Sequence, residues 1–249
     1  MCLLALFFRV VEDAPVVVGV NREELYVRGG EPPRIVEGSC RIVAGHDPRA
    51  AGTWFGVNEH GVVVAVTNRL KSEVPAEPRS RGLLVRELLE CSSAAKAVEL
   101  AERELGSHRY AGCNLLCADH ERATVLHAGD WLRVRPLPPG LHVLTAHDVN
   151  DASDRRLGHA LWWLTQRGYG RATHCVSALK ELCAQKGNGD PAICLRGEAG
   201  GTVSSSIVSL PLSKERSTYL HAQGPPDATP YADYSPLLRQ IFTTPAGRE

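Results

Sequence analysis

The sequence predicts an α+β protein in which two mainly antiparallel sheets face each other and helices cover their outer sides. The predicted elements run in the order strands, helices, strands, helices, strands, and short turns join neighbouring strands. The helical segments carry Leu and Ala at three- and four-residue spacing, which is typical of a helix with one buried face. Two separate α+β lobes would give the same order, so the sequence leaves that alternative open. We expect a single domain over residues 1–249.

The strand predictions come from apolar or β-branched runs bounded by turn residues. Two hairpins are expected in the first seventy residues, 3–11 with 16–20 and 53–57 with 61–67, separated by Gly/Pro-rich or polar loops at 29–33 and 46–52. Later strands are expected at 110–118, 123–128, 131–134, 141–145, 201–210 and 217–221.

The helix predictions rest on apolar spacing and on capping residues. Helices are expected at 82–90, 94–105, 156–167 and 173–185, with a short one near 236–242. Ser92 or Ser93 is a suitable N-cap for the second of these helices, because a serine oxygen accepts a hydrogen bond from a free backbone N–H.

The composition is that of an ordinary globular chain, with 43% hydrophobic and 22% charged residues. Lys plus Arg equals Asp plus Glu, at 28 each, so no net charge attracts nucleic acid. No apolar run reaches the roughly 18 residues of a membrane span. The apolar start, Met1 to Val11, lacks a basic n-region and a small-residue cleavage site, so we expect a strand there and not a signal peptide.

The cysteines and histidines give no pattern of a disulfide framework or a metal centre. None of the eight cysteines forms a C-x-x-C pair, and reduced thiols in the cytoplasm are the simplest interpretation. Cys113 and Cys117 are expected on one buried strand face, with Asn114 on the other. The ten histidines show no H-x-x-x-H or H-E-x-x-H spacing, so we predict no metal. No nucleotide-binding fingerprint occurs, and we predict no cofactor.

The start Met1-Cys2 carries chemistry of its own. Removal of Met1 would leave Cys2 with a free α-amine, whose reference pKa is about 7.7–8.0, beside a thiol of about 8.5. One residue then supplies both a nucleophile and a general base. The simpler alternative is that Cys2 packs as a small apolar residue in its strand.

Several ordered segments resemble one known family. Asn21-Arg22-Glu23-Glu24 follows the first hairpin, and Tyr26 and Arg28 come shortly after it. Further matching segments are Ala51 to Asn58, which contains Trp54, Ala65 to Arg69, Gly112 to Asp119, and Gly201 to Ser206. Together with Met-Cys, they resemble the NRDE (Tango2-like) family, which is named for Asn-Arg-Asp-Glu at the end of this hairpin.

The resemblance implies the four-layer αββα sandwich of the amino-terminal nucleophile hydrolases. Cysteine members of that fold cleave non-peptide C–N amide bonds. Carried over by motif position, Cys2 is the nucleophile and Arg22 the cation near its sulfur. Glu23 or Glu24 would hold the α-ammonium group. Asn68 and Asn114 would contact an oxyanion or a substrate amide.

Strand alternation divides the tetrapeptide between two faces. If the strand continues through it, Asn21 and Glu23 face one side and Arg22 and Glu24 the other. We therefore favour Arg22 and Glu24 as the working pair. The residues assigned to substrate binding are Asn21, Glu23, Arg28, Trp54 and Ser204. For Ser204, a place on a solvent-exposed strand face is an equal alternative.

Three departures from the family pattern matter for this site. Glu23 replaces Asp and is one methylene longer, which changes the reach of a contact. Ala51 replaces the first Gly of Gly-Gly-Thr-Trp, which matters only if a positive φ is required. Near Leu144 the family tends to read Leu-Ser-Asn, and here His147 is the candidate to replace that asparagine.

These observations favour an amidase-type hydrolase that forms an acyl-Cys2 intermediate. The alternative is a non-catalytic binding or carrier protein for haem or a lipid-like acyl molecule, since eukaryotic family members are linked to Golgi organisation and to haem and lipid handling. Either function implies a small-molecule ligand, no nucleic acid and no membrane span. The sequence does not indicate an oligomeric state.

Overall fold

The computed structural model describes residues 2–107 and 109–243, and within them the strands form two sheets. The first sheet has six strands in the order β10-β1-β2-β11-β12-β13. Their bounds are β1 Leu3–Val11, β2 Ala14–Leu25, β10 Gly140–Leu144, β11 Gly200–Leu210, β12 Thr218–Ala222 and β13 Ala232–Asp233. All the neighbours in this sheet pair antiparallel.

The second sheet has seven strands in sequence order, β3 to β9, and is an antiparallel meander. Its strands are β3 Glu31–Val36, β4 Ile42–His46, β5 Phe55–Asn58, β6 Val63–Asn68, β7 Cys113–Ala118, β8 Ala123–Ala128 and β9 Leu132–Leu137. Each strand pairs with the next one along the chain, and the one long connection, residues 69–112 between β6 and β7, contains two helices.

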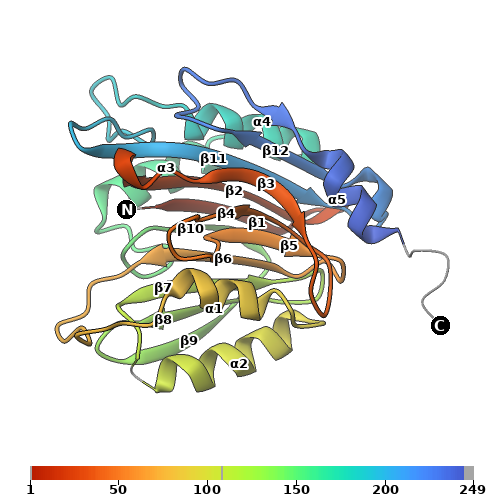
Figure 1. The fold of residues 1–249 in the computed structure, drawn as a ribbon. Helices are drawn as coiled ribbons and strands as arrows, with labels where there is room; N and C mark the ends of the chain where they lie inside the picture. Colours follow the sequence, from red (N-terminus) through yellow and green to blue (C-terminus); the bar gives the residue numbers. More distant parts are fainter. Residues whose placement is uncertain (1, 108, 244–249) are drawn as a thin grey trace.

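Four helices lie on the outer faces of the two sheets. Helices α1 (Arg81–Leu88) and α2 (Ala94–Gly106) cover the second sheet, and α3 (Arg155–Thr165) and α4 (Ala172–Cys183) cover the first (Figure 1). The predicted cap of α2 is Ser93, whose side chain accepts a hydrogen bond from the Lys96 backbone N–H. A fifth helix, α5 (Ser235–Phe242), and two short 3-10 turns, η1 (Tyr26–Arg28) and η2 (Lys214–Arg216), complete the described elements.

Three apolar layers hold this arrangement together, which confirms the αββα sandwich and excludes two separate lobes. In β1, Leu4, Leu6 and Phe8 pack between the sheets, whereas the alternate residues Leu3, Ala5 and Phe7 pack against α3 and α4. A third cluster lies between the second sheet and helices α1 and α2. Because both faces of the strands are buried, they read as continuous apolar runs.

The structure differs from the sequence prediction most clearly after the first hairpin. Strand β2 does not end at Val20 but continues through the tetrapeptide to Leu25. The expected loop 29–33 overlaps β3, and β4 was not predicted. Pro32 and Pro33 argued against a strand here, because proline has no backbone N–H to donate to a neighbouring strand. In the structure β3 is an edge strand, where this missing donor is tolerated.

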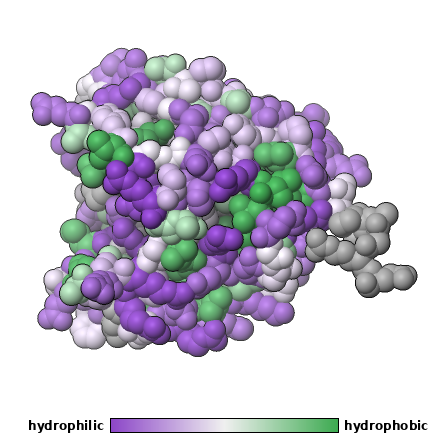
Figure 2. Space-filling model, viewed as in Figure 1, coloured by the Kyte–Doolittle hydropathy of each residue, from purple (hydrophilic) through white to green (hydrophobic). Residues whose placement is uncertain are grey.

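The face shown in Figure 2 is mainly hydrophilic, with separate apolar patches. Large exposed apolar side chains include Leu25 and Val27 near η1 and Leu70 in the loop after β6. Within the described ranges, no helix is long and apolar enough to cross a membrane.

Candidate active site at the start of the first strand

Cys2 lies immediately before β1, at the end of the sandwich where β2 carries the tetrapeptide. Leu3 pairs with Asn21 in the ladder, which places Cys2 beside Arg22 on the neighbouring strand. Cys2 is buried and lines a cavity of about 350 Å³. Because Cys2 and Leu4 alternate with Leu3, the Cys2 side chain faces the space between the sheets.

Arg22 is the cation of this cavity. Its guanidinium lies 4.2 Å from the ring centroid of Trp54, and its Nη1 donates to the carbonyl oxygen of Gly29 at 2.5 Å. Burial lowers the pKa of Arg22, although the Glu24 carboxylate and the Cys2 thiol act in the opposite direction. The aromatic face and the carbonyl therefore hold a largely desolvated charge in one position.

A chain of alternating charges leads away from Arg22 along the cavity wall. Arg22 Nη2 lies 3.8 Å from Glu24 Oε2, and the same oxygen lies 3.6 Å from Arg28 Nε. Arg28 in turn donates to Asp47 Oδ2 at 2.7 Å. Burial opposes ionisation of Asp47, but the hydrogen bonds from Arg28 and from the Arg49 backbone lower its pKa overall. Each acidic group is thus matched by a neighbouring arginine.

The thiol of Cys2 is protonated at neutral pH in this environment. Burial raises the pKa of Cys2, and the Glu23 carboxylate raises it further. The backbone N–H of Glu23 and the charge of Arg22 lower the pKa of Cys2 but do not cancel the effect of burial. A reactive thiolate at this position therefore needs a local base that accepts the proton.

Glu23 lies on the opposite face of β2 from Arg22. Arg156 of α3 donates to Glu23 Oε1 at 3.0 Å, and the hydroxyl of Thr202 donates to the same oxygen at 3.1 Å. Burial raises the pKa of Glu23 to about 7, and Arg156 lowers it in part. Glu23 also borders the Cys2 cavity. The Glu23 carboxylate therefore links β2 to α3 through Arg156 and to β11 through Thr202.

Asn21 shares the Glu23 face and lies in the helix layer. Its Nδ2 donates to the carbonyl oxygens of Cys183, at the end of α4, at 2.9 Å and Ile193 at 3.2 Å. It does not line the Cys2 cavity. Asn21 therefore connects β2 to the end of α4 and to the loop that follows it.

The two candidate asparagines of the second sheet lie in different surroundings. Asn68, at the end of β6, is exposed and borders the Cys2 cavity. Asn114 is fully buried outside that cavity, and its Nδ2 donates to the carbonyl oxygens of Thr145 and His147 at 3.0 Å each. Asn114 thus connects β7 of the second sheet to residues 145–147, which follow β10 of the first sheet. His147 itself does not line the cavity.

Ser204 lies in a neighbouring cavity of about 270 Å³, which shares Arg22 and Trp54 with the Cys2 cavity. Strand β11 places it opposite Arg22 in the ladder. Ser204 therefore stands on the other side of the Arg22–Trp54 pair from the thiol. Of the predicted residues, Cys2, Arg22, Glu23, Glu24, Arg28, Trp54 and Asn68 share the first cavity, and Asn21, Asn114 and Ser204 do not line it.

The rest of the cavity wall was not predicted from the sequence. Most of it comes from the loop 47–54 and from the start of α1, including Asp47, Ala50, Thr53, Ser80 and Arg81. These residues show no periodic pattern and meet only because the two segments touch. A Cβ on Gly52 would lie 2.3 Å from the backbone carbon of Gly82, so this contact requires glycine.

Ala51, in the same loop, has a φ of 52°, in the left-handed region. The replacement of the family's first glycine therefore matters here. An alanine in this conformation costs about 1–2 kcal/mol.

A second, more open cleft of about 630 Å³ continues from the Cys2 cavity and shares Glu23, Glu24 and Asn68 with it. Its far wall carries Lys186, Leu195 and Arg196. A ligand that reaches Cys2 can therefore extend in two directions from the Glu24–Asn68 rim.

The architecture is that of the amino-terminal nucleophile hydrolases. A Caenorhabditis elegans N-acylethanolamine-hydrolyzing acid amidase ortholog is similar in structure, with a TM-score of 0.57 and 16% identity over 82% of this chain and 91% of that one. Penicillin V acylase from Agrobacterium tumefaciens also has a TM-score of 0.57, with 11% identity over 89% of this chain and 82% of that one. These likenesses concern the fold.

The family assignment follows from the sequence match. The model of the Transport and Golgi organisation 2 family matches residues 1–194, and the chain belongs to this family. The human Transport and Golgi organization protein 2 homolog is 29% identical over 106 residues, which are 41% of this chain and 38% of that protein. The mouse homolog is 30% identical over the same shares. The match thus spans about two fifths of each relative.

Proposed function

We propose that this protein is an amino-terminal cysteine hydrolase that cleaves a non-peptide C–N amide bond through an acyl-Cys2 intermediate. The observation that carries the proposal is the position of Cys2, whose thiol borders a cavity beside a buried arginine at the start of the first strand. The fold it shares with two amide-cleaving enzymes supports this chemistry by analogy.

The first step is removal of Met1, which frees the α-amine of Cys2. Met1 lies outside the described residues, so its removal stays a prediction. Because burial raises the pKa of the thiol, attack at neutral pH requires proton transfer to a base. The α-amine is the base within reach by covalent structure, and Arg22 stabilises the thiolate that forms. Glu24, on the cavity face of β2, is our candidate to orient the α-ammonium group.

The thiolate then attacks the amide carbonyl carbon, and a C–S bond forms as the carbonyl oxygen takes negative charge. Asn68, at the cavity rim, is our candidate donor to this oxygen. The C–N bond breaks, and the leaving nitrogen takes the proton that the α-amine removed from sulfur. Water then hydrolyses the thioester, which releases a carboxylic acid and restores the thiol.

The shape of the site favours a substrate that is small or extended. The cavity of about 350 Å³ holds the reacting group, and the adjoining cleft gives room for the remainder. Arg28 and Trp54 line the first space and are the proposed substrate contacts there. Ser204 and Asn21, which lie outside it, act in this proposal through the strands they hold.

The test is intact mass of the purified protein before and after iodoacetamide treatment at neutral pH. We expect a chain without Met1 and faster labelling at Cys2 than at Cys91, a partly exposed thiol far along the chain. An amide-substrate screen with the Cys2→Ser variant as control then follows.

Retained Met1, or labelling of Cys2 no faster than Cys91, contradicts the proposal. Stoichiometric binding of haem or an acyl molecule without turnover, unchanged by Cys2→Ala, would instead support a carrier protein.

A further inference from the structure

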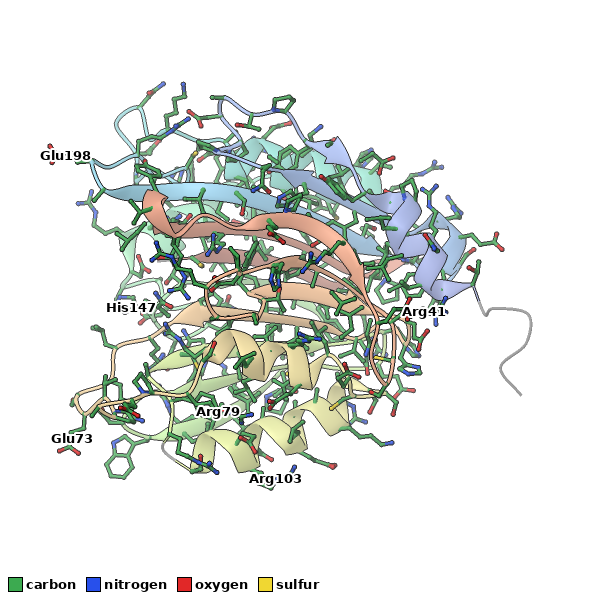
Figure 3. All side chains as sticks on the ribbon, in the orientation of Figure 1. Arg41, Glu73, Arg79, Arg103, His147 and Glu198 are labelled. Carbon is green, nitrogen blue, oxygen red and sulfur yellow. The ribbon has the colours of Figure 1, made fainter. Side chains whose placement is uncertain are left out.

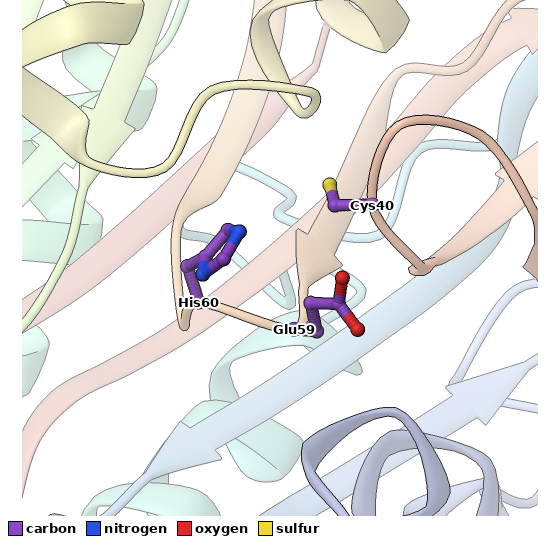
Figure 4. Close-up of side chains that lie close together, drawn as sticks. All are labelled: Cys40, Glu59 and His60. Atoms are coloured by element: carbon purple, nitrogen blue, oxygen red, sulfur yellow. The ribbon is translucent and has the colours of Figure 1, made fainter. Parts of the chain in front are cut away.

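A second cluster of chemically active side chains lies at the opposite end of the sandwich from Cys2. Cys40, Glu59 and His60 each offer one ligand atom, and the three atoms all lie within 4.8 Å of one another (Figure 4). Figure 3 shows this separation. Arg41, which contacts Glu59, is labelled at one end of the molecule, and His147 is labelled at the other end, where Cys2 lies.

Two loops bring these side chains together. Cys40 lies two residues before β4, and Glu59 and His60 lie in the turn between β5 and β6. Ile42 pairs with Asn58 in the β4–β5 ladder, so the residues just beyond the pair, Arg41 with Glu59 and Cys40 with His60, come to lie side by side. The cluster is therefore fixed by sheet register and not by sequence spacing.

Hydrogen bonds hold both loops to the end of α1. Asn58 Nδ2 donates to the carbonyl oxygens of Leu89 at 2.8 Å and Cys91 at 2.7 Å, and Asn58 Oδ1 accepts from the His60 N–H at 3.0 Å. Glu90 Oε2 accepts from the backbone N–H of Cys40 at 3.2 Å. Such surrounding contacts reduce the entropy that ligand side chains lose when a metal binds.

We propose that Cys40, Glu59 and His60 form a binding site for a borderline-soft divalent metal ion, with Zn²⁺ as the best match. Thiolate, imidazole and carboxylate are the three ligand types that zinc uses in proteins. Ligand atoms in a tetrahedral zinc site lie about 3.3–3.8 Å apart. Small side-chain rotations from a cluster that already fits within 4.8 Å close this gap. Three protein ligands leave a fourth position for water.

The charges around the cluster permit a cation. Arg41 donates to Glu59 Oε2 at 2.7 Å, and Lys214 donates to the Glu59 carbonyl oxygen at 3.1 Å. Arg41 thus uses one carboxylate oxygen and leaves the other for the metal, as a supporting contact does in many sites. Glu90, which holds the Cys40 backbone, adds a nearby negative charge.

The end of α1 holds the Cys40 thiol in place, because its Sγ donates to the Leu89 carbonyl oxygen at 3.2 Å. The thiolate is the form that binds zinc, so binding replaces this hydrogen bond with a bond to the metal and releases the proton.

The test is titration of the EDTA-treated full-length protein with Zn²⁺ by calorimetry and with Co²⁺ by absorption. We expect one ion per chain and a thiolate-to-cobalt charge-transfer band. His60→Ala, at an exposed position, is expected to weaken Zn²⁺ binding at least about tenfold without affecting the fold. Cys40→Ser is expected to abolish the cobalt band. His120→Ala, which changes another exposed histidine, serves as the matched control with wild-type affinity.

The absence of one-to-one saturable binding, or equal affinity in wild type and His60→Ala, would overturn the proposal. The Cys2→Ala variant is expected to bind Zn²⁺ as the wild type does, because the two sites lie at opposite ends of the sheets. The result is therefore independent of the hydrolase proposal.

Discussion

The two side-chain faces of the tetrapeptide in β2 have different surroundings, a cavity on one side and the helix layer on the other. Arg22 and Glu24 border the Cys2 cavity and form its chain of charges. Asn21 and Glu23 point toward α3 and α4, where they bind carbonyl oxygens and Arg156. The difference follows from the two-residue period of a strand.

This comparison explains why the register of β2 is critical. A shift by one residue would exchange the two sets and turn the side chains of Asn21 and Glu23 toward the space between the sheets. The long ladder with β11, which runs from Leu25 to Val16, opposes such a shift. The tetrapeptide therefore anchors the helix layer and also forms part of the wall of the Cys2 cavity.

The largest expected effect comes from removing the nucleophile on the cavity face. Cys2→Ala is expected to lower turnover of any amide substrate at least about a thousandfold, because no covalent intermediate can form. Urea unfolding checks that the fold is retained. If the variant still turned over the substrate at the wild-type rate, Cys2 would not be the nucleophile and catalysis would not take place in this cavity.

On the helix face, Glu23→Gln tests the buried carboxylate. Folded Glu23 keeps its proton up to about pH 7, whereas the unfolded chain loses it near 4.5. The folded state binds more protons in this window, so Glu23 makes stability fall as pH rises through it, by on the order of 3 kcal/mol. Unfolding in urea at about pH 5 and about pH 8 measures this slope, and Glu23→Gln is expected to remove it.

His127 provides an opposing dependence that both proteins share, since burial lowers its pKa to about 4. The difference between the wild type and Glu23→Gln is therefore the quantity to compare. Identical slopes in the two proteins would show that Glu23 is ionised in both the folded and the unfolded state over this window.

Asn21→Ala is expected to lower the free energy of unfolding by about 1–3 kcal/mol, because two buried carbonyl oxygens lose their donor. The labelling rate of Cys2 is expected to stay near wild type. If Asn21→Ala instead kept the wild-type free energy of unfolding but slowed the labelling of Cys2, Asn21 would act on the thiol. The two faces of the tetrapeptide would then not have separate roles.

Arg22→Met removes the cation on the cavity face and keeps a side chain that can pack on Trp54. We expect the rate of iodoacetamide labelling at Cys2 to fall about tenfold, equivalent to one pKa unit. Arg22→Lys, which keeps the charge but not the planar stacking, is expected to retain more of the rate. Equal rates in all three proteins would argue against thiolate stabilisation by Arg22.

The smallest effect concerns the loop 47–54, which lines part of the Cys2 cavity. Ala51→Gly is expected to raise the free energy of unfolding by about 0.5–1 kcal/mol, because glycine adopts the observed φ of 52° without strain. Ala50→Gly, one residue earlier, is the matched control and is expected to be neutral or destabilising. Thermal or urea unfolding distinguishes the two.

Much of the fold followed from local pattern. The run Ala123–Ala128 was predicted with its observed bounds, and the N-cap Ser93 was one of two candidates. The edge strand β3 was missed because its prolines disfavour strands in general and are tolerated only at an edge. Whether a strand is central or at an edge is a property of the sheet, which a local window cannot contain.

The candidate site was only partly predictable for the same reason. Cys2, Arg22 and Glu24 could be proposed from motif and alternation. Asp47 and Arg81 join them from loops without any pattern, and Asn114 leaves the site because its amide is used between the sheets.

The sequence by itself determined the order of elements, the alternation within β2 and a chemically capable residue at position 2, because these depend on neighbours along the chain. Only the tertiary structure decided that Glu23 contacts Arg156, that the loop 47–54 lines the Cys2 cavity and that Cys40 lies near His60. Those outcomes depend on how distant segments pack and pair, and the free energy of such contacts has no local signature.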